Sequence, residues 1–334
     1  MKKILVALMS MVCSVCAWAH NFELDGIYYN ILNDKNNEVE VTYKGSAAFT
    51  VRNEYIDTIV IPSTVTYKGN VYHVTKIGHN AFRYSESLKA LTIPSSIIEI
   101  GHGAFVHCSA LGSITVEEGN PIYNSQDACN AIIETSTNTL IVGCKNTIIP
   151  STVTKIGEWA FAGCHYIENI NFQDTIPLDV IRYYQDDTKP TSLTIPNTVT
   201  KIDEYAFFNC LYLRFVTIPE GVKTIGNSAF ASCYNLKYVS IPSSVTAIGE
   251  YSFSDCSALR TLTLSEGLKI IDYRAFKNCS SLKSVAIPSS VETIEWCAFK
   301  GCKSLEIVAI LGDSEIGNRA FPSRTKIFWS GNRD

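Results

Sequence analysis

The sequence predicts a solenoid, a chain that winds into stacked coils, because three kinds of residue return with one fixed spacing of 23 residues. That spacing is kept by phenylalanine, cysteine and proline, at Phe207, Phe230, Phe253, Phe276 and Phe299, at Cys210, Cys233, Cys256, Cys279 and Cys302, and at Pro196, Pro219 and Pro242. A period of this length is typical of repeat architectures, in which each unit packs against its neighbours. The chain is therefore expected to offer a stacked surface without a single deep reaction centre.

Residues 236–259 show how one coil is expected to begin. Val239 and Ile241 alternate with a polar residue, which predicts a short strand with one buried face. Pro242 ends this strand, because proline has no N–H to donate to a neighbouring strand. After a turn, residues 245–248 form a second extended piece.

The rest of the coil is expected to form a short helical turn. Gly249 precedes this turn, and glycine or aspartate stands at most equivalent positions. Both residue types are suitable for the start of a helix. Phe253 and Cys256 are three residues apart, so on a helix they would share one face. One coil cannot bury its apolar face alone, and the coils must therefore stack.

The predicted fold is an α/β solenoid of about nine coils, with short parallel strands and short helical turns. An alanine or serine before phenylalanine marks these coils, at Phe82, Phe105, Phe161, Phe207, Phe230, Phe253, Phe276, Phe299 and Phe321. Three insertions interrupt the period. They are a turn at residues 68–70, a longer segment near 117–146 and an irregular segment near 173–191. We place the solenoid at residues 58–327 and a C-terminal tail at 328–334.

The insertion near residues 117–146 is predicted to contain a β-hairpin. Residues 131–133 and 140–142 are apolar and flank a polar turn. Cys129 and Cys144 are equally far from the centre of this turn, so we expect them to face each other across the strands. Both lie outside the repeat in a chain expected to be exported, which makes the pair a disulfide candidate, with two free thiols as the alternative.

A second hairpin is predicted at residues 20–57. Its strands would span residues 26–32 and 39–43, on either side of a polar turn at 33–37. An open strand edge invites pairing with other chains, and native folds cover such edges. We interpret this hairpin as a cap on the first coil.

Residues 1–19 have the features of a secretory signal peptide. Two lysines precede an apolar stretch too short to span a bilayer, and Ala17 and Ala19 form a small-residue cleavage site. No later stretch is apolar enough over sufficient length for a membrane helix. The net charge of −4 gives no argument for nucleic acid binding. The expected location is the outside of the cell, secreted or surface-bound, or the periplasm.

The repeated pattern Leu-x-x-Val-x-Ile-Pro-x-x-Val-x-x-Ile-Gly-x-x-Ala-Phe-x-x-Cys resembles the treponemal-type leucine-rich repeat of the BspA-like family of bacterial surface proteins. The resemblance runs from about Ile59 to Phe321. It implies a curved solenoid at the cell surface or secreted from it. Some members are adhesins that bind host matrix or plasma proteins such as fibronectin and fibrinogen, but no residue motif for that binding exists to transfer.

The repeated cysteines are interpreted as small buried hydrophobic residues. The seven equivalent positions are Cys108, Cys164, Cys210, Cys233, Cys256, Cys279 and Cys302. A metal site would need closely spaced ligand pairs within a coil, and the repeats contain no C-x-x-C motif. Helices pack about 8–10 Å apart, whereas bridged Cα atoms lie within about 7 Å. The predicted helical turns would thus keep the cysteines of neighbouring coils too far apart for disulfides.

A column of cations is the clearest candidate for ligand binding. Arg214, Lys237, Arg260 and Lys283 follow the leading leucine of four successive coils. Strands about 4.8 Å apart would align them into a ridge of roughly 15 Å, suited to a sulfated glycan or an acidic protein segment. The alternative is that they only keep a strand edge soluble.

Phe215 and Tyr238 are candidate aromatic anchors beside this ridge, one coil apart. Exposed neighbouring aromatic rings make favourable contacts with sugars or proteins. The alternative is that they cover neighbouring side chains.

Catalytic patterns are weak. His79 and His102 are repeat equivalents, but no acidic residue accompanies them at a metal-ligand spacing. The chain has no phosphate-binding loop or nucleophile motif. We therefore predict a non-enzymatic adhesion module without cofactor or metal, which binds an extracellular protein or glycan ligand. A polysaccharide-binding protein and a structural spacer of the envelope are the alternatives.

Overall fold

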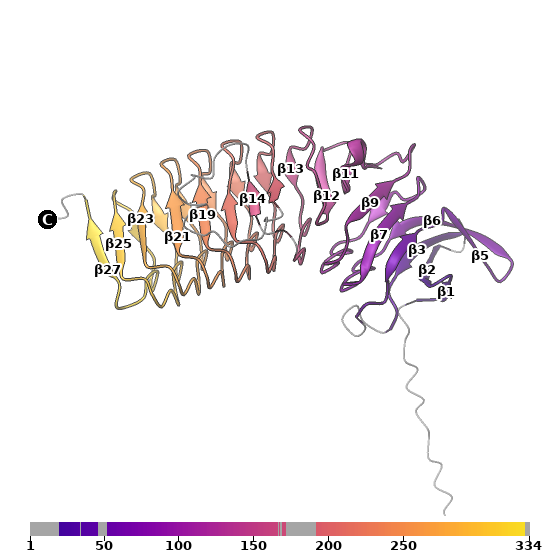
Figure 1. The fold of residues 1–334 in the computed structure, drawn as a ribbon, viewed down its shortest axis with the longest axis horizontal. Coiled ribbons are helices and arrows are strands. Elements are labelled where there is room, and N and C mark those ends of the chain that lie inside the picture. Colours follow the sequence, from indigo (N-terminus) through magenta and orange to yellow (C-terminus); the bar gives the residue numbers. More distant parts are fainter. Residues whose placement is uncertain are drawn as a thin grey trace, which may run out of the picture.

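The computed structural model describes residues 20–33, 35–45, 52–165, 167, 169–171 and 192–330, and it shows an elongated β-solenoid. About ten coils stack along the long axis, with the strands of successive coils side by side (Figure 1). The predicted solenoid fold is confirmed. The proposed signal peptide and the irregular insertion near residues 173–191 lie outside the described residues.

The first face of the solenoid carries the strands of the Val-x-Ile segments, which pair in parallel from coil to coil in three sheets. In spatial order these are β4 (Asp57–Val60), β7 (Leu88–Ile93) and β9 (Ser113–Val116); β15 (Ser192–Thr194), β14 (Asn169–Asn171), β17 (Phe215–Thr217), β19 (Tyr238–Ile241) and β21 (Thr261–Leu264); and β23 (Ser284–Ile287), β25 (Ile307–Ile310) and β27 (Lys326–Trp329). As predicted, β19 ends directly before Pro242. β27 continues the third sheet into residues that the sequence suggested were a tail.

The second face is a ten-stranded sheet, built mostly from two-residue strands. Its order is β10 (Tyr123–Asn124), β11 (Ala131–Glu134), β12 (Thr139–Gly143), β13 (Lys155–Ile156), β16 (Lys201–Ile202), β18 (Thr224–Ile225), β20 (Ala247–Ile248), β22 (Ile270–Ile271), β24 (Thr293–Ile294) and β26 (Glu315–Ile316). From β12 onward every pairing is parallel, whereas β10, β11 and β12 pair antiparallel.

The third side of each coil is a series of turns, and the predicted helical turn is wrong. In the coil of Phe253 the N–H groups of Tyr251, Phe253 and Asp255 donate to carbonyls of the next coil, at 2.7 to 3.0 Å. The N–H groups between them close tight turns within the coil. Tyr251 and Asp255 also have positive φ angles of 54° and 63°. A helix requires consecutive right-handed residues that bond within the segment, so this alternation prevents one.

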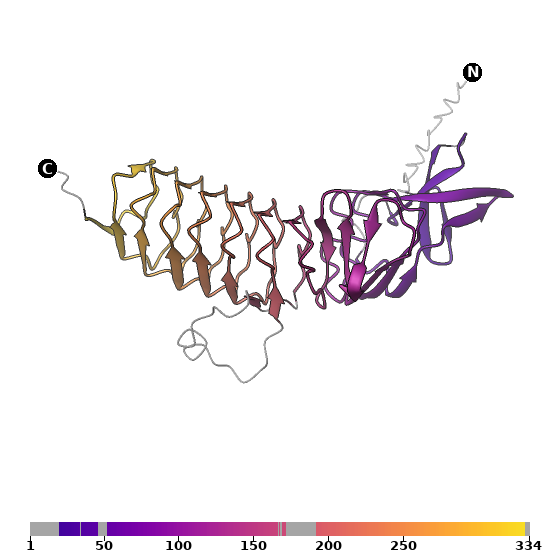
Figure 2. The ribbon, with the colours of Figure 1, turned by 90° about the horizontal axis from the view of Figure 1, so that it is seen from above.

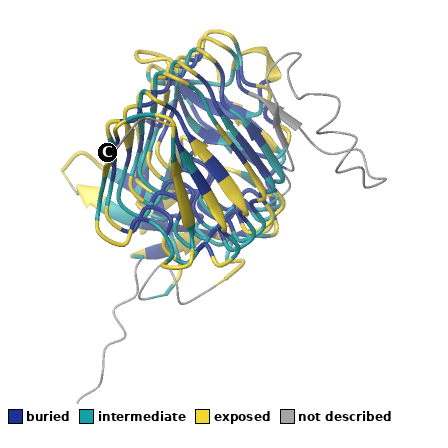
Figure 3. Ribbon diagram, turned by 90° about the vertical axis from the view of Figure 1, so that its left-hand side faces the viewer, coloured by how far each residue is buried: buried dark blue, intermediate teal, exposed yellow. Residues whose placement is uncertain are grey.

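The phenylalanine of each turn fills the core. Phe253 is fully buried, and its ring stacks on the rings of Phe230 and Phe276 at 5.1 and 5.3 Å. Similar stacks continue from Phe161 to Phe321. Figure 3 shows the resulting rows of buried and exposed residues, which continue from coil to coil. The only helix among the described residues is the short 3-10 turn η1 (Gln126–Ala128).

A separate sheet covers the N-terminal edge, as the predicted cap required. Its order is β1 (Phe22–Leu24), β2 (Ile27–Asn33), β3 (Glu38–Thr42), β6 (Asn70–Ile77) and β5 (Thr64–Tyr67), with β8 (Glu99–Ile100) also on β6. β2 and β3 form the antiparallel hairpin, and β3 joins it to the solenoid by pairing in parallel with β6. Figure 2 shows this sheet, in indigo, at one end of the stack. The predicted turn between β5 and β6 uses Lys68 and Gly69, both with positive φ.

Replacing the central ring tests this packing. Phe253→Ala should lower the free energy of unfolding by about 3–5 kcal/mol, because it leaves a cavity between two stacked rings. Chemical denaturation measures the change. Tyr234→Ala, at a half-exposed ring, is the control and should cost far less. An unchanged melting temperature for Phe253→Ala would contradict the assignment of this row to the core.

Candidate binding surfaces

The repeat is broken between Phe105 and Phe161, which are 56 residues apart. The rings stack at 5.2 Å from Phe82 to Phe105 and at 5.1 Å from Phe161 to Phe207, while β12 lies between the two series. The N–H of Gly143 in β12 donates to the carbonyl of Ala160 at 2.8 Å, the bond that a coil would otherwise make. A Cβ on Gly143 would lie 2.0 Å from the Phe161 ring. The hairpin therefore replaces a coil and leaves no room for a further ring.

This replacement leaves a wedge-shaped gap between the neighbouring coils on the turn side. At its closed end the N–H of His107 donates directly to the carbonyl of Ala162 at 3.0 Å. At its open end a hollow of about 270 Å³ is lined by residues 100–106 and by Ile141, Val142, Glu158 and Trp159. A second hollow of about 530 Å³ shares Ile141 and Glu158 with it and is lined further by Glu134, Thr137, Thr139, Thr154, Lys155, Gly157, Thr200, Lys201 and Asp203. We call the two hollows together the junction groove.

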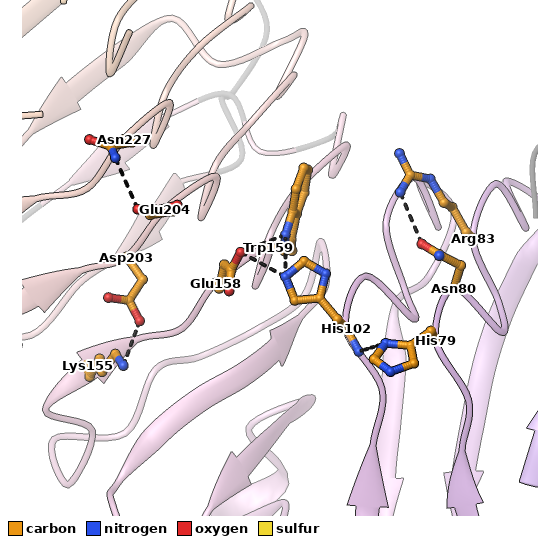
Figure 4. Close-up of polar contacts among 10 residues, drawn as sticks. All are labelled: His79, Asn80, Arg83, His102, Lys155, Glu158, Trp159, Asp203, Glu204 and Asn227. Carbon is orange, nitrogen blue, oxygen red and sulfur yellow. Dashed lines mark hydrogen bonds and ion pairs between the residues drawn. The ribbon is translucent and has the colours of Figure 1, made fainter. Parts of the chain in front are cut away.

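A hydrogen-bonded trio bridges the open end of the groove (Figure 4). Nε2 of His102 lies 2.8 Å from Oε1 of Glu158, and the indole N–H of Trp159 lies 3.1 Å from both of those atoms. The consistent assignment places a proton on Nε2 of His102, so that the imidazole and indole N–H groups both donate to the carboxylate. Among the described residues, the second carboxylate oxygen of Glu158 and Nδ1 of His102 have no hydrogen-bond partner.

The neighbouring imidazole is fixed in one tautomer. The backbone N–H of His102 donates to Nδ1 of His79 at 3.0 Å, so the proton of the His79 ring is on Nε2. Both histidines are exposed. The sequence placed them in equivalent coils, and the structure brings them together, but Glu158, their acidic neighbour, is 56 residues beyond His102.

Trp159 is held from behind by other aromatic rings. Its ring stacks on Tyr205 at 4.1 Å with an angle of 2°, and the ring of Phe208 meets it edge-on at 5.9 Å. The guanidinium of Arg83 lies 6.0 Å from the Trp159 ring centre. Trp159 has a positive φ of 59°, but so does Tyr205 with 55°, so this conformation belongs to the coil geometry.

Charges along the second hollow are paired. Asp203 accepts from Lys155 at 2.6 Å and from Lys201 at 2.8 Å. Three carboxylates and two ammonium groups line the junction groove as a whole. The groove is therefore polar without a strong net charge.

The basic ridge lies on another part of the surface. Its backbone groups are joined in sequence, because Lys237 N–H donates to the Arg214 carbonyl at 2.8 Å and Arg260 N–H to the Lys237 carbonyl at 3.0 Å. Arg260 and Lys283 are exposed, whereas Arg214 and Lys237 are half-buried. Their equivalent Lys89, in an earlier coil, is paired with Asp57 at 2.7 Å.

The expected pair of exposed aromatic anchors is not present. Phe215 and Tyr238 are register partners in neighbouring strands, as the period requires. Phe215 is half-buried, however, and Tyr238 is only 7% exposed. Tyr238 lies in the middle of a parallel sheet, flanked by Phe215 and Thr261, so its ring packs within the row and offers little surface to a ligand.

All seven repeated cysteines are buried and unbridged. The distance used to exclude disulfides between coils was wrong, because the stacked rings of neighbouring coils are 5.0 to 5.3 Å apart. The thiols instead bond to the main chain: Cys256 Sγ donates to the carbonyl of Phe230 at 3.3 Å, and Cys279 repeats this bond to Phe253. Burial raises the pKa of Cys256 well above its ordinary value, and it raises the pKa of Cys108 to about 12.

The predicted disulfide between Cys129 and Cys144 is also absent, since both thiols are free. Ala131 lies opposite Gly143 in the hairpin, so the two cysteines are not register partners. Side chains alternate along each strand, and those of Cys129 and Cys144 enter different core clusters. Their distances from the turn can be read from the sequence, but the bulge that sets the register cannot.

His107 is a buried histidine close to the groove. Its ring stacks on Tyr84 at 4.7 Å, and only 8% of the residue is exposed. Burial, and then the nearby charges of His165, Arg83 and Arg52, lower its pKa to about 4. His107 is therefore neutral at physiological pH.

No group of three or more His, Cys, Asp or Glu side chains in the described parts of the chain is arranged to hold a metal ion. Within the same residues, no helix has the length and apolar character needed to cross a membrane.

Comparison with known proteins agrees with this geometry. The fold is a leucine-rich-repeat solenoid, and the family model for the BspA type leucine rich repeat region matches residues 53–139, 142–184 and 180–306, in six copies. These ranges cover more than half of the sequence, so the chain belongs to the BspA-type leucine-rich repeat family. No curated protein matches the chain in sequence.

Two solved structures illustrate the similarity. A leucine-rich repeat protein from Bacteroides ovatus is 25% identical with a TM-score of 0.56, and the match covers 93% of this chain and 71% of that one. A leucine-rich repeat protein from Eubacterium ventriosum is 23% identical with a TM-score of 0.60, and the match covers 83% of this chain and 66% of that one. They support the fold.

The buried thiols should be unreactive in the folded protein. With reductant removed, iodoacetamide at pH 8 should leave Cys256 and its equivalents unmodified until denaturant is added, because they are protonated and inaccessible. Mass spectrometry before and after unfolding counts the modified thiols. Cysteines that stay blocked after unfolding without reductant would contradict the free thiols of the structure.

Stability should fall as the pH drops from about 7 to 4. The unfolded chain protonates His107 near pH 6.5, whereas the folded chain does so only near pH 4, so acid favours unfolding. The contribution of His107 at pH 5 should be at most about 2 kcal/mol. Urea denaturation at several pH values, compared with His107→Gln, measures it. Equal pH slopes for the two proteins would show that His107 titrates normally.

Proposed function

We propose that this chain is an exported, non-enzymatic binding module that holds an extracellular protein on the surface of its solenoid. The observation that carries the proposal is the register of the basic ridge. Arg214, Lys237, Arg260 and Lys283 occupy one position of four successive coils, and main-chain bonds join the first three. A rigid row of like charges complements an acidic protein segment better than four scattered lysines would.

Family membership supports a binding role, because solenoids of this kind present long surfaces rather than deep clefts. Export rests on the signal-peptide pattern at residues 1–19 and on the family resemblance. The choice of host matrix or plasma proteins rests on that resemblance alone. Phe215 and Tyr238 are half-buried and buried, and they support the strands beneath the ridge more than they contact a ligand.

The ridge is tested by removing its charges together. Replacing Arg214, Lys237, Arg260 and Lys283 with Ser should weaken binding to matrix and plasma proteins by at least about tenfold at low salt, with less effect at high salt because exposed charges are screened. Surface plasmon resonance with fibronectin, fibrinogen and heparin provides the measurement.

The control removes four lysines elsewhere, Lys223, Lys277, Lys300 and Lys303, with the same change in net charge. It should bind as the wild type does. Equal binding by the ridge variant and the wild type would remove the ridge from the proposal. Heparin binding alone would favour the alternative of a polysaccharide-binding protein, and a wild type that binds none of these ligands would favour a structural spacer.

A further inference from the structure

We propose that the junction groove is a second binding site, distinct from the basic ridge, and that its ligand is a neutral oligosaccharide. This proposal does not depend on the ridge. It follows from the shape of the groove, the chemistry of its lining and the strand pairing along its floor.

The shape comes first. Between Phe105 and Phe161 the hairpin replaces a coil and leaves a depression on the turn side. The two hollows, of about 270 and 530 Å³, share Ile141 and Glu158. Sites for small ligands have volumes of roughly 300–1,000 Å³. The groove is thus large enough for a few sugar units that run along β12.

The lining combines an aromatic ring with convergent polar atoms. Trp159 is half-buried but lines the first hollow, and it is fixed by its stack on Tyr205 and by its indole hydrogen bond to Glu158. Beside it, the second oxygen of Glu158 and Nδ1 of His102 accept no hydrogen bond from the described residues. A pyranose ring has an apolar C–H face and a rim of hydroxyl groups, which an aromatic ring and such acceptors match together.

The charges of the lining argue against anionic ligands. Asp203 pairs with both Lys155 and Lys201, and Glu134 and Glu158 bring the lining to three carboxylates against two ammonium groups, so the groove has no excess of positive charge for a sulfated or phosphorylated ligand. The hydroxyls of Thr137, Thr139, Thr154 and Thr200 extend the polar lining. Neutral hydroxylated ligands are left as the favoured class.

The strand pairing argues against a peptide. Peptides often bind by adding a strand to an open sheet edge. The strand along the floor, β12, is paired on both sides, with β11 and β13. It offers no free edge, so a ligand here must be held by side chains.

The test uses the full chain and a panel of neutral linear hexasaccharides, built from glucose with α-1,4 or β-1,4 links, from mannose, from xylose and from N-acetylglucosamine. Isothermal titration calorimetry, supported by tryptophan fluorescence, should detect binding of at least one at millimolar concentration or below. Trp159→Ala should weaken that binding by at least about tenfold. Glu158→Ala, at an exposed side chain, should also weaken it without lowering the melting temperature.

Trp296→Ala is the matched control, because Trp296 is a half-exposed tryptophan on the turns of a distant coil. This variant and the ridge variant should both keep wild-type affinity for the hexasaccharide. The proposal is overturned if no hexasaccharide binds, or if Trp159→Ala and Glu158→Ala bind as well as the wild type. It is also overturned if only the ridge variant loses binding, or if Trp159→Ala impairs capture of a matrix protein while no sugar binds.

Discussion

The spacing between coils is the constraint on which the structure depends. Main-chain hydrogen bonds join each coil to the next on the sheet faces and again through the turns, at 2.7 to 3.0 Å in the coil of Phe253. The rings of stacked phenylalanines consequently repeat at 5.0 to 5.3 Å. With the coils held at one strand spacing, each position of the repeat becomes a row, and the residue type at that position fixes whether the row is core or surface.

This constraint also limits where a binding site can form. Regular rows give long, shallow surfaces, on which a partner must be held by several coils at once, as we propose for the basic ridge. Depth appears where the register is interrupted. Between Phe105 and Phe161 the hairpin strand β12 takes the place of a coil, and side chains from coils on either side then face each other across the groove. Both proposed sites thus follow from the register of the coils. The basic ridge lies where the register is regular, and the junction groove lies where the hairpin interrupts it.

The sequence predicted the features that depend on the 23-residue period, but it did not predict those that depend on local backbone geometry. The buried ring of Phe253 follows from the 23-residue repeat alone. The helical turn does not, because a spacing of three between Phe253 and Cys256 suits a helix and a series of tight turns equally. The error in the turn led to the error in coil spacing. The contact of His102 with Glu158 and Trp159 was beyond prediction, since it requires knowing that the hairpin displaces a coil; the 56-residue gap was its only signal.

Within each coil, the positions that stabilise the core differ from the positions that face a ligand. Arg214 lies between the buried Leu213 and the partly buried Phe215, and the next residue, Val216, is fully buried. Substitutions at the position of Arg214 alter the surface row while the leucine and valine rows continue to hold the coil, which is why four ridge residues can be replaced together without entering the core. The junction groove lacks this freedom, because Gly143 must remain small against Phe161 for the hairpin to fit. The recognition proposed for the ridge therefore depends on surface side chains, whereas the groove exists only as long as the hairpin keeps its place in the stack.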